Sequence, residues 1–483
     1  MNYKLMGRFI AQILLVEGAF MVPALLVSLF YGEYNAAVAF FKTLIILLLV
    51  VLVLRALCRN APKGFYAKEG LFCVGLSWIV MGLIGSVPFY LSQEIPDYID
   101  AFFEIVSGFT TTGASILNDV EALTHGMLYW RSFSHWVGGM GVLVFLLAVA
   151  PVSGRSDGFA MHILRAESPG PNVGKLVPRM RQTAMILYLI YIGLTIANAI
   201  FLLLGDMPLF DAVCTALGTA GTGGFGIKND SIAGYSPYIQ WVTTIFMLLF
   251  GVNFSCYYLL LLGKVANVFK DEELRLYLGI IAGSITLITI NLWGRFETLE
   301  EGLRHVSFQV ATVITTTGFA TTDFDQWHSF SKSIMFCLML VGASAGSTGG
   351  GFKCGRLLLV FKILKRNIEQ VLAPQKIQVV RLNGQAMDEK ILSHTNAYLA
   401  AYVVIMAVSY IIISLDGFSI TTNLSAVVAC FNNIGPGFEG VGPTQNYAGF
   451  STLSKFVLII NMLAGRLEIF PILVLFSRNA WRY

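Results

Sequence analysis

The chain has 483 residues, of which 56% are hydrophobic and only 12% are charged, with a formal net charge of +4. Soluble domains carry about 25% charged residues, so this composition excludes a soluble globular protein and indicates a membrane protein. Such a small net charge gives no reason to expect a nucleic-acid partner. The seven cysteines and six histidines show no spacing typical of a metal-binding or redox motif.

Ten apolar segments are long enough to cross a bilayer, which takes about 20 residues of helix. The first follows Lys4 and Arg8 and has no clear signal-peptide cleavage site, so we predict a retained membrane helix there. In chain order the predicted spans are 9–31, 36–57, 70–92, 127–150, 184–205, 237–263, 276–294, 329–365, 394–415 and 452–477.

Four shorter apolar runs lie between the later spans, and at about ten residues they are too short to cross. We predict re-entrant helices at 100–110, 210–219, 304–314 and 422–431. Each run ends at a stretch rich in threonine, asparagine or glycine, at 110–114, 220–224, 315–319 and 432–436. Taking Gly113, Gly223, Gly318 and Gly435 as common points, subtraction of their numbers gives intervals of 110, 95 and 117 residues. These intervals are too long for a solenoid.

The pattern predicts an all-α polytopic membrane protein, with two leading helices followed by four helix–pore helix–filter–helix repeats around one central pore. The predicted parts are a leading domain at 1–68 and pore repeats at 69–178, 179–274, 275–390 (with a gating loop) and 391–483. Glycine at one such stretch could equally serve close helix packing. Four stretches in the same context favour a pore.

The basic residues predict an amino terminus on the inner side, because lysine and arginine collect in cytoplasmic loops. The predicted inner loops hold Arg55, Arg59, Lys63, Lys68, Arg155, Arg165, Lys175, Arg179, Arg181, Lys264, Lys270, Arg275, Lys353, Arg356, Lys362, Lys365, Arg366, Lys376, Arg381 and Lys390. The predicted outer segments are richer in acid, and we expect carboxylates such as those of Asp119, Glu121 and Glu104 to raise the cation concentration at the pore mouth.

The composition of the four stretches suits dehydration of a monovalent cation by backbone carbonyl oxygens facing one axis. Glycine tolerates the positive φ angles that such a backbone requires, and threonine adds a hydroxyl oxygen. The preceding short helices would point the negative ends of their dipoles at the cavity beneath, which favours cations. The candidate ion-coordinating residues are Thr111, Thr112, Gly113, Ala220, Gly221, Thr222, Gly223, Thr316, Thr317, Gly318, Asn433, Ile434 and Gly435.

A glycine-rich segment interrupts the span 329–365, with five glycines between 342 and 351. Each glycine costs about 1 kcal/mol in a helix interior, so we expect this segment to unwind, although a plain kink remains an alternative. A phosphate-binding loop is excluded because Phe352 separates Gly351 from Lys353. Arg466 lies within the last span, where an arginine usually faces a polar cavity. Snorkelling to the inner interface is the alternative for Arg466.

Several motifs resemble the Trk/Ktr potassium-uptake superfamily, and within it the membrane subunit of bacterial Trk systems. They are Asp100–Glu104 with Ser107–Ala114, Thr315–Phe324, Ser134–Gly141, and Glu167–Pro171 before Pro178-Arg179. The fourth stretch departs from threonine, with Asn433-Ile434 in place of Thr-Thr. We expect this departure to affect how sharply potassium is preferred over sodium.

The resemblance implies potassium conduction across the cytoplasmic (inner) membrane of a bacterium, with K+ as the transported ion and no cofactor on the chain. It implies that a loop formed by Gly346, Ser347, Thr348, Gly349, Gly350 and Gly351 crosses the pore beneath the filter as a flexible gate. Arg466 would be an electrostatic barrier and loop anchor. The resemblance also implies a homodimer in the lipid bilayer, with one pore per protomer, and a cytosolic TrkA-like ring that binds NAD and ATP.

Two other classes of function are compatible with a polytopic chain. A proton-coupled secondary potassium transporter with alternating access needs carboxylates at mid-membrane, and Glu468 is the one good candidate. An intramembrane enzyme needs a nucleophile and base or a metal set, and the sequence shows neither. We therefore predict a protein that is not an enzyme.

Overall fold

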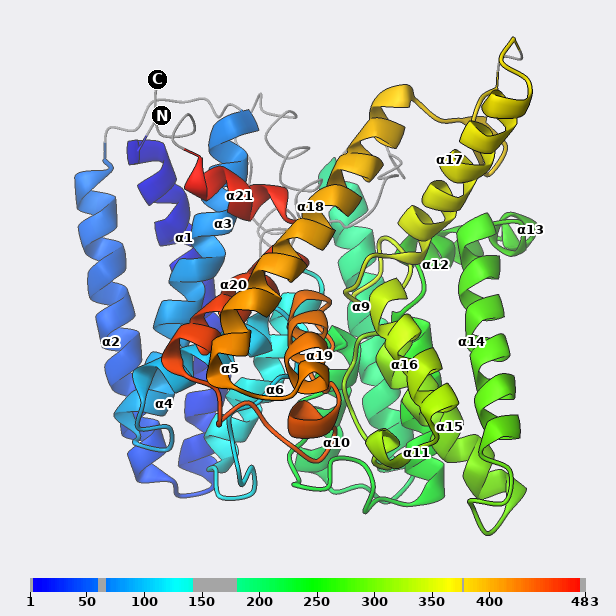
Figure 1. Cartoon of the computed structure of the whole chain (residues 1–483). Coiled ribbons are helices and arrows are strands. Elements are labelled where there is room, and N and C mark those ends of the chain that lie inside the picture. Colours follow the sequence, from blue (N-terminus) through cyan, green and yellow to red (C-terminus); the bar gives the residue numbers. More distant parts are fainter. Residues whose placement is uncertain (1–2, 60–66, 142–179, 376–377, 478–483) are drawn as a thin grey trace.

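The computed structural model describes residues 3–59, 67–141, 180–375 and 378–477, and these form a bundle of helices (Figure 1). Within these residues, six helical segments are long and apolar enough to cross a membrane. They are α1 (Tyr3–Phe30), α2 (Tyr34–Leu57), α3 with α4 (Ala67–Gly85 and Val87–Leu91), α9 (Met180–Leu203), α14 (Glu272–Asn291) and α18 (Glu389–Ile413). The prediction of an all-α polytopic membrane protein is confirmed.

The leading helices α1 and α2 pack against each other and against α3 and α6, at one edge of the bundle (Figure 1). On α2, Phe40 and Leu47 are buried, whereas Leu48 and Leu52 on the other face are exposed. An apolar helix with an exposed apolar face is typical of a membrane protein, in which that face meets lipid.

Several of the later predicted spans are interrupted, and here the sequence prediction is partly wrong. They contain α11 and α12 (Pro237–Phe250, Phe254–Leu261), α16 and α17 (Ser329–Val341, Cys354–Leu372), and α20 and α21 (Thr452–Arg466, Phe470–Phe476). The described part of the predicted span 127–150 contains α6 (His125–Gly139). We predicted a break only within 329–365, but α11 and α12 are bent by 89° at residues 251–253. The break after α20 follows from positive φ at Glu468 and Ile469.

Four short helices lie inside the bundle at the predicted re-entrant positions. They are α5 (Tyr98–Phe109), α10 (Leu209–Gly221), α15 (Leu299–Ile314) and α19 (Ile420–Phe431). Every residue of α5 from Ala101 to Phe109 is buried. A helix buried on all sides must be surrounded by protein. Side chains of Asp97, Thr298 and Ser419 cap three of these helices by accepting backbone N–H groups.

The remaining elements are short connections. They are α13 (Val265–Phe269), the 3₁₀ turns Phe324–Gln326, Ser414–Asp416 and Glu439–Val441, and the antiparallel strands β1 (Arg381–Leu382) and β2 (Gln385–Ala386). Several sequence-based assignments fall outside the described residues. They are the part of the fourth span at 142–150, Lys63, Arg155, Arg165, Lys175, Arg179, Lys376, and the motif Glu167–Pro171 with Pro178.

Candidate ion-conduction site

Each of the four short helices ends in the same backbone conformation. Two residues with positive φ follow, separated by one residue, and they are Thr111 and Gly113, Thr222 and Gly224, Thr316 and Gly318, and Asn433 and Gly435. A β-branched residue rarely adopts positive φ, at a cost of about 1–3 kcal/mol. Threonine adopts it at three of these positions, which points to a functional constraint.

Hydrogen bonds repeat in the same way at the four helix ends. In each stretch the N–H between the two positive-φ residues donates to the carbonyl five residues earlier. The pairs are Thr112 N to Ser107 O at 2.8 Å, Gly223 N to Gly218 O at 3.0 Å, Thr317 N to Thr312 O at 2.8 Å, and Ile434 N to Ala429 O at 2.9 Å. The four stretches are therefore structural equivalents, and we call them the filter segments.

The second filter segment differs by one residue from the predicted alignment. Gly224, with φ +74°, is the equivalent of Gly113, whereas the sequence analysis aligned Gly223 there. Ala220 and Gly221 are the last residues of α10. Three glycines within Gly221–Gly224 made this register impossible to assign from the residue types alone.

The filter segments meet in a closed ring. A Cβ atom added to any of the equivalent glycines would come closer than 3.0 Å to a carbonyl oxygen of another segment. The added Cβ atom of Gly113 would contact Gly223 O, and that of Gly224 would contact Thr317 O. The added Cβ atom of Gly318 would contact Ile434 O, and that of Gly435 would contact Thr112 O. The contacts follow chain order and return to the first segment, so the four carbonyl-bearing residues Thr112, Gly223, Thr317 and Ile434 surround one axis.

Asn433 takes part in the ring although it replaces threonine. Its Nδ2 donates to Thr112 Oγ1 at 3.0 Å and to Met462 O at 3.0 Å. The amide therefore ties the fourth filter segment to the first. This contact holds the fourth segment in place although it lacks the threonine hydroxyl groups of the other segments.

A cavity of about 260 Å³ opens on one side of the ring and is lined by residues of all four segments, including Gly113, Gly224, Gly318 and Gly435. Arg131 also lines this cavity. Its Nε donates to Glu104 Oε1 at 2.6 Å, and its Nη1 donates to Gly226 O at 2.9 Å. Glu104 is fully buried. The expectation that its carboxylate attracts cations at the mouth is wrong, because Arg131 pairs with it.

His135 supports the second filter segment, and the sequence analysis did not single it out. Its Nδ1 lies 2.8 Å from Gly108 O, and its Nε2 accepts the N–H of Phe225 at 3.2 Å. His135 is fully buried. A Cβ atom at Gly223 would collide with its imidazole ring, and one at Gly221 would collide with its backbone carbonyl. A histidine one helical turn after Arg131, on the same face of α6, was the available signal.

The glycine-rich segment between α16 and α17, residues 342–353, lies against the helix-end side of the ring; we call it the gate loop. Gly350 N donates to Thr316 Oγ1 at 2.6 Å, and a Cβ atom at Gly349 would lie 2.7 Å from Thr315 O. Gly342, Gly346 and Gly351 have positive φ, so the segment is unwound as predicted.

The gate loop is also bound at the bend between α11 and α12. Gly346 O accepts the N–H of Phe254 at 3.0 Å, and Thr348 Oγ1 donates to Phe250 O at 3.2 Å. Ser347 is buried, and its hydroxyl donates to Ser344 O at 2.7 Å. The bend between α11 and α12 is therefore bonded directly to the gate loop.

Two cationic side chains hold the gate loop. Arg466 donates from Nη1 to Thr348 O at 2.8 Å and from Nη2 to Gly139 O at 2.6 Å, with Gly138 O as a further acceptor. Arg466 therefore faces polar groups inside the protein and does not snorkel. Lys353, which the sequence analysis assigned to an inner loop, is buried, and its ammonium donates to Gly349 O.

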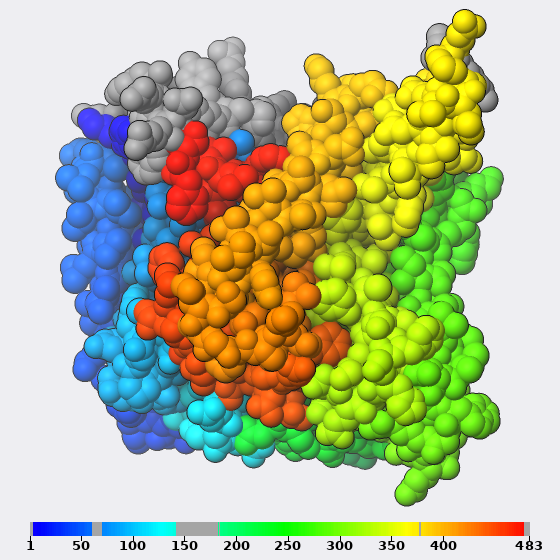
Figure 2. Space-filling model, in the orientation of Figure 1, coloured from blue at the N-terminus to red at the C-terminus, as the bar shows by residue number. Residues whose placement is uncertain are grey.

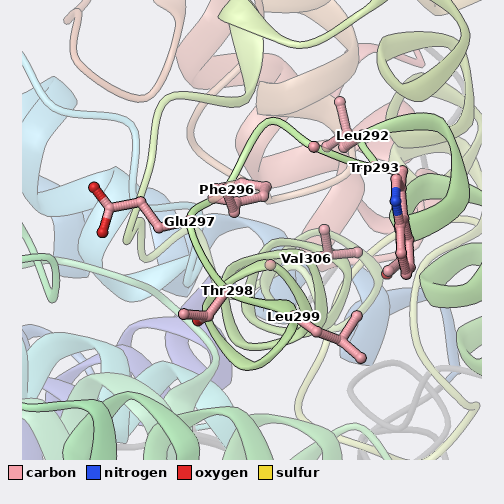
Figure 3. A pocket seen from close by; sticks show the side chains of 10 residues that line it. Leu292, Trp293, Phe296, Glu297, Thr298, Leu299 and Val306 are labelled. Atoms are coloured by element: carbon pink, nitrogen blue, oxygen red, sulfur yellow. The ribbon is translucent and has the colours of Figure 1, made fainter.

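A separate cavity of about 230 Å³ lies far from the ring, between the ends of α14 and α15. Trp293, Phe296, Leu299 and Val306 surround it (Figure 3). None of the filter or gate residues lines it, so we assign it no part in conduction.

An all-helical polytopic chain whose re-entrant segments form one closed ring is typical of a membrane transport protein. Comparisons with known proteins agree. Residues 36–483 match the TrkH family, described as a cation transport protein. The Trk system potassium uptake protein TrkH of Salmonella typhimurium is 35% identical over 100% of both chains. The Trk system potassium uptake protein TrkG of Escherichia coli is 32% identical over 96% of this chain and 95% of its own.

The crystal structure of the potassium transporter TrkH from Vibrio parahaemolyticus superposes with a TM-score of 0.87 at 29% identity, covering both chains completely. The chain belongs to the TrkH family of cation transport proteins. The prediction of a protein that is not an enzyme is confirmed, because the family consists of transport proteins.

Proposed function

We propose that the chain conducts potassium through the ring of filter segments. The observation that carries this proposal is the closed cycle of glycine–carbonyl contacts, which brings the peptide oxygens of Thr112, Gly223, Thr317 and Ile434 around one axis. Rings of carbonyl oxygens can replace the hydration shell of a potassium ion. The relatives TrkH and TrkG are both named potassium uptake proteins.

Charge selection follows from the helices that precede the filter segments. The carboxyl ends of α5, α10, α15 and α19 meet at the ring, and each carries about half a negative charge. Thr111 Oγ1 is buried and has no hydrogen-bond partner within the described residues. Within the ring itself, an ion would meet the oxygen atoms of carbonyls and of this hydroxyl, which suits a cation.

The gate loop and the two side chains that hold it form a barrier in this proposal. Arg466 brings a positive charge to the side of the ring on which the pore helices end, and Lys353 lies there at the end of the gate loop. A cation leaving the ring would be repelled by Arg466 and blocked by the loop. Conduction then requires the loop to leave Arg466 and Thr316.

The experiment is single-channel recording of the purified chain in bilayers, with potassium on one side and sodium on the other. Stepwise currents that favour potassium support conduction through a pore. Saturable flux without current steps, driven by a proton gradient, would favour the alternating-access transporter instead. In the structure the carboxylate of Glu468, the candidate proton carrier, pairs with Arg356.

The surroundings of the pore are also part of the proposal. The carboxyl end of α2, α13 and α17 lie toward one end of the bundle, and their basic residues suit the cytoplasmic side of a bacterial inner membrane (Figure 1). We propose an inner amino terminus, a homodimer with one pore in each protomer, and docking of a cytosolic TrkA-like ring that binds NAD or ATP. Recording with and without that ring and each nucleotide tests the docking.

We also propose that the chain is divided into five parts. They are a leading pair of helices at 1–68 and four pore units at 69–178, 179–274, 275–390 and 391–483. Co-expression of 1–274 with 275–483 tests one boundary. Recovery of potassium flux by the two pieces together would support independent folding units on either side of residue 275.

A further inference from the structure

A third cavity, of about 350 Å³, lies where α18 begins, away from the ring and between α17, α18 and the start of α21. Its lining is Arg356, Lys390, Ile391, His394, Thr395, Tyr398, Glu468 and Phe470. Cavities of this size hold small ligands or parts of larger ones. Three of the lining residues are basic (Arg356, Lys390 and His394), and one is acidic (Glu468). The cavity is therefore suited to a charged ligand.

One charged pair inside the cavity is already formed. Arg356 Nη2 donates to Glu468 Oε2, and the Arg356 guanidinium carbon lies 4.1 Å from the ring centre of Tyr398. The other oxygen of the carboxylate, Glu468 Oε1, is buried and has no hydrogen-bond partner within the described residues. A buried carboxylate oxygen in this state is costly unless a donor reaches it. The cavity therefore presents one unmet acceptor.

Two basic side chains line the same cavity. Lys390 and His394 are one helical turn apart on α18, on the face that also carries Tyr398. Both residues are exposed, and within the described residues neither side chain has a hydrogen bond or ion pair, whereas the nearby Arg366 pairs with Glu389 at 2.6 Å. Lys390 and His394 therefore offer donors to an anion.

We propose that this cavity binds the headgroup of a phospholipid that carries both a phosphodiester and a primary ammonium, as phosphatidylethanolamine does. The phosphodiester would accept from Lys390 and His394, and the ammonium would donate to Glu468 Oε1. Such a ligand contacts the unpaired carboxylate oxygen and the two basic side chains at once, whereas a free phosphate contacts only the basic pair. The site goes beyond the proposed conduction function.

The position of the cavity fits a lipid. It lies at one end of α18, a helix long enough to cross the membrane, whose Val403, Val404 and Ile411 are exposed. Figure 2 shows α18 running diagonally across the surface of the molecule. Phe470, at the rim of the cavity, is 39% exposed and gives an apolar surface for the start of the acyl chains.

Bound lipid would also brace the gate. Arg356 lies on α17, directly after the gate loop, and Glu468 lies two residues after Arg466. A headgroup joined to Glu468 and to α18 would link the carboxyl end of the loop to the helix break that positions Arg466.

The test is native mass spectrometry of the purified full chain, titrated with phosphatidylethanolamine, phosphatidylcholine and phosphatidylglycerol of identical acyl chains. We expect wild type to retain phosphatidylethanolamine at least about tenfold more tightly than phosphatidylcholine, whose trimethylammonium cannot donate a hydrogen bond. Glu468→Gln should lose this preference. The double variant Lys390→Gln, His394→Gln should weaken binding of phosphatidylethanolamine and of phosphatidylcholine about tenfold, because both lipids carry the phosphodiester.

Lys365→Gln is the matched control, because Lys365 is an exposed cation on α17 outside the cavity lining. Equal retention of the three lipids by wild type would overturn the proposal. So would an unchanged preference in Glu468→Gln, or an equal effect of Lys365→Gln. Binding of inorganic phosphate at the same residues without retention of lipid would also overturn it. These readouts measure binding alone, so a failure of potassium conduction leaves them unaffected.

Discussion

The ring of filter segments and the gate loop both contain unwound, glycine-rich backbone in the interior of a membrane protein, yet they are held in different ways. Each filter segment is fixed to its own helix by backbone hydrogen bonds that recur four times. The gate loop occurs once, and it is held by side chains outside the loop, among them Thr316 and Arg466, and by backbone bonds at the bend between α11 and α12.

The difference indicates which region can move. Rearranging a filter segment breaks bonds at the end of its pore helix and disturbs contacts with two other segments. Displacing the gate loop needs only a few hydrogen bonds to be exchanged, each with a net value of about 0.5–1.5 kcal/mol, or about 1.5–3 kcal/mol where a charge takes part. We therefore expect the ring to be rigid and the loop to be the moving part.

The largest effect is expected from Gly224→Ala in the ring. Its φ of +74° and the carbonyl of Thr317 both oppose a Cβ atom. Strain of about 1–3 kcal/mol with an added backbone collision should lower potassium flux into liposomes by about 10–100-fold. Gly193→Ala in α9 should leave flux unchanged, because no described residue outside the surrounding helix backbone lies within 4 Å of the added Cβ. Equal flux in both variants would contradict a rigid ring.

Arg131→Gln tests the scaffold behind the ring. It leaves Glu104 buried without its cation, which should lower the free energy of unfolding by about 3–5 kcal/mol. The exposed pair of Lys365 and Glu369, 3.9 Å apart, provides the control, and Lys365→Gln should change stability by less than about 1 kcal/mol. Unfolding in detergent would measure the stability of both variants. A similar loss of unfolding free energy in Arg131→Gln and Lys365→Gln would show that the buried pair contributes no more to stability than the exposed pair.

Arg466→Ala tests the gate loop. Removing the guanidinium leaves the carbonyls of Thr348, Gly138 and Gly139 without their donor and removes a positive charge, so resting potassium flux should rise about tenfold. Arg466→Lys keeps the charge but cannot reach all three carbonyls, and should give an intermediate flux. If the resting flux of Arg466→Ala equals that of wild type, the barrier lies elsewhere.

The smallest effect is expected from a matched pair of equivalent threonines. Thr316→Val removes the acceptor of Gly350 N and should raise resting flux about 2–5-fold, as expected for one hydrogen bond. Thr111→Val changes the same position in the first segment, whose hydroxyl has no described partner, and should not raise it. An increase in both variants would place the effect in the ring and not at the loop contact.

Much of the fold was predictable because membrane helices have strict requirements of length and polarity. The re-entrant helices, the unwound gate loop and the polar surroundings of Arg466 all follow from short apolar runs, clustered glycines and the cost of a charge in lipid. The bend at residues 251–253 was not predicted, although Gly251 and Asn253 are poor helix formers and Asn253 caps α12 by accepting the N–H of Ser255. The gate loop also bonds to the chain there, and that contact depends on the tertiary structure.

The sequence by itself determined that the chain crosses a membrane, that four similar segments recur, and which loop and arginine differ from the rest. These are properties of composition and local spacing. Only the tertiary structure decided the register of Gly224, the pairing of Glu104 with Arg131, the burial of His135 and Lys353, and the closure of the ring. Each of these depends on contacts between residues far apart in the chain, and such contacts leave no local pattern in a single sequence.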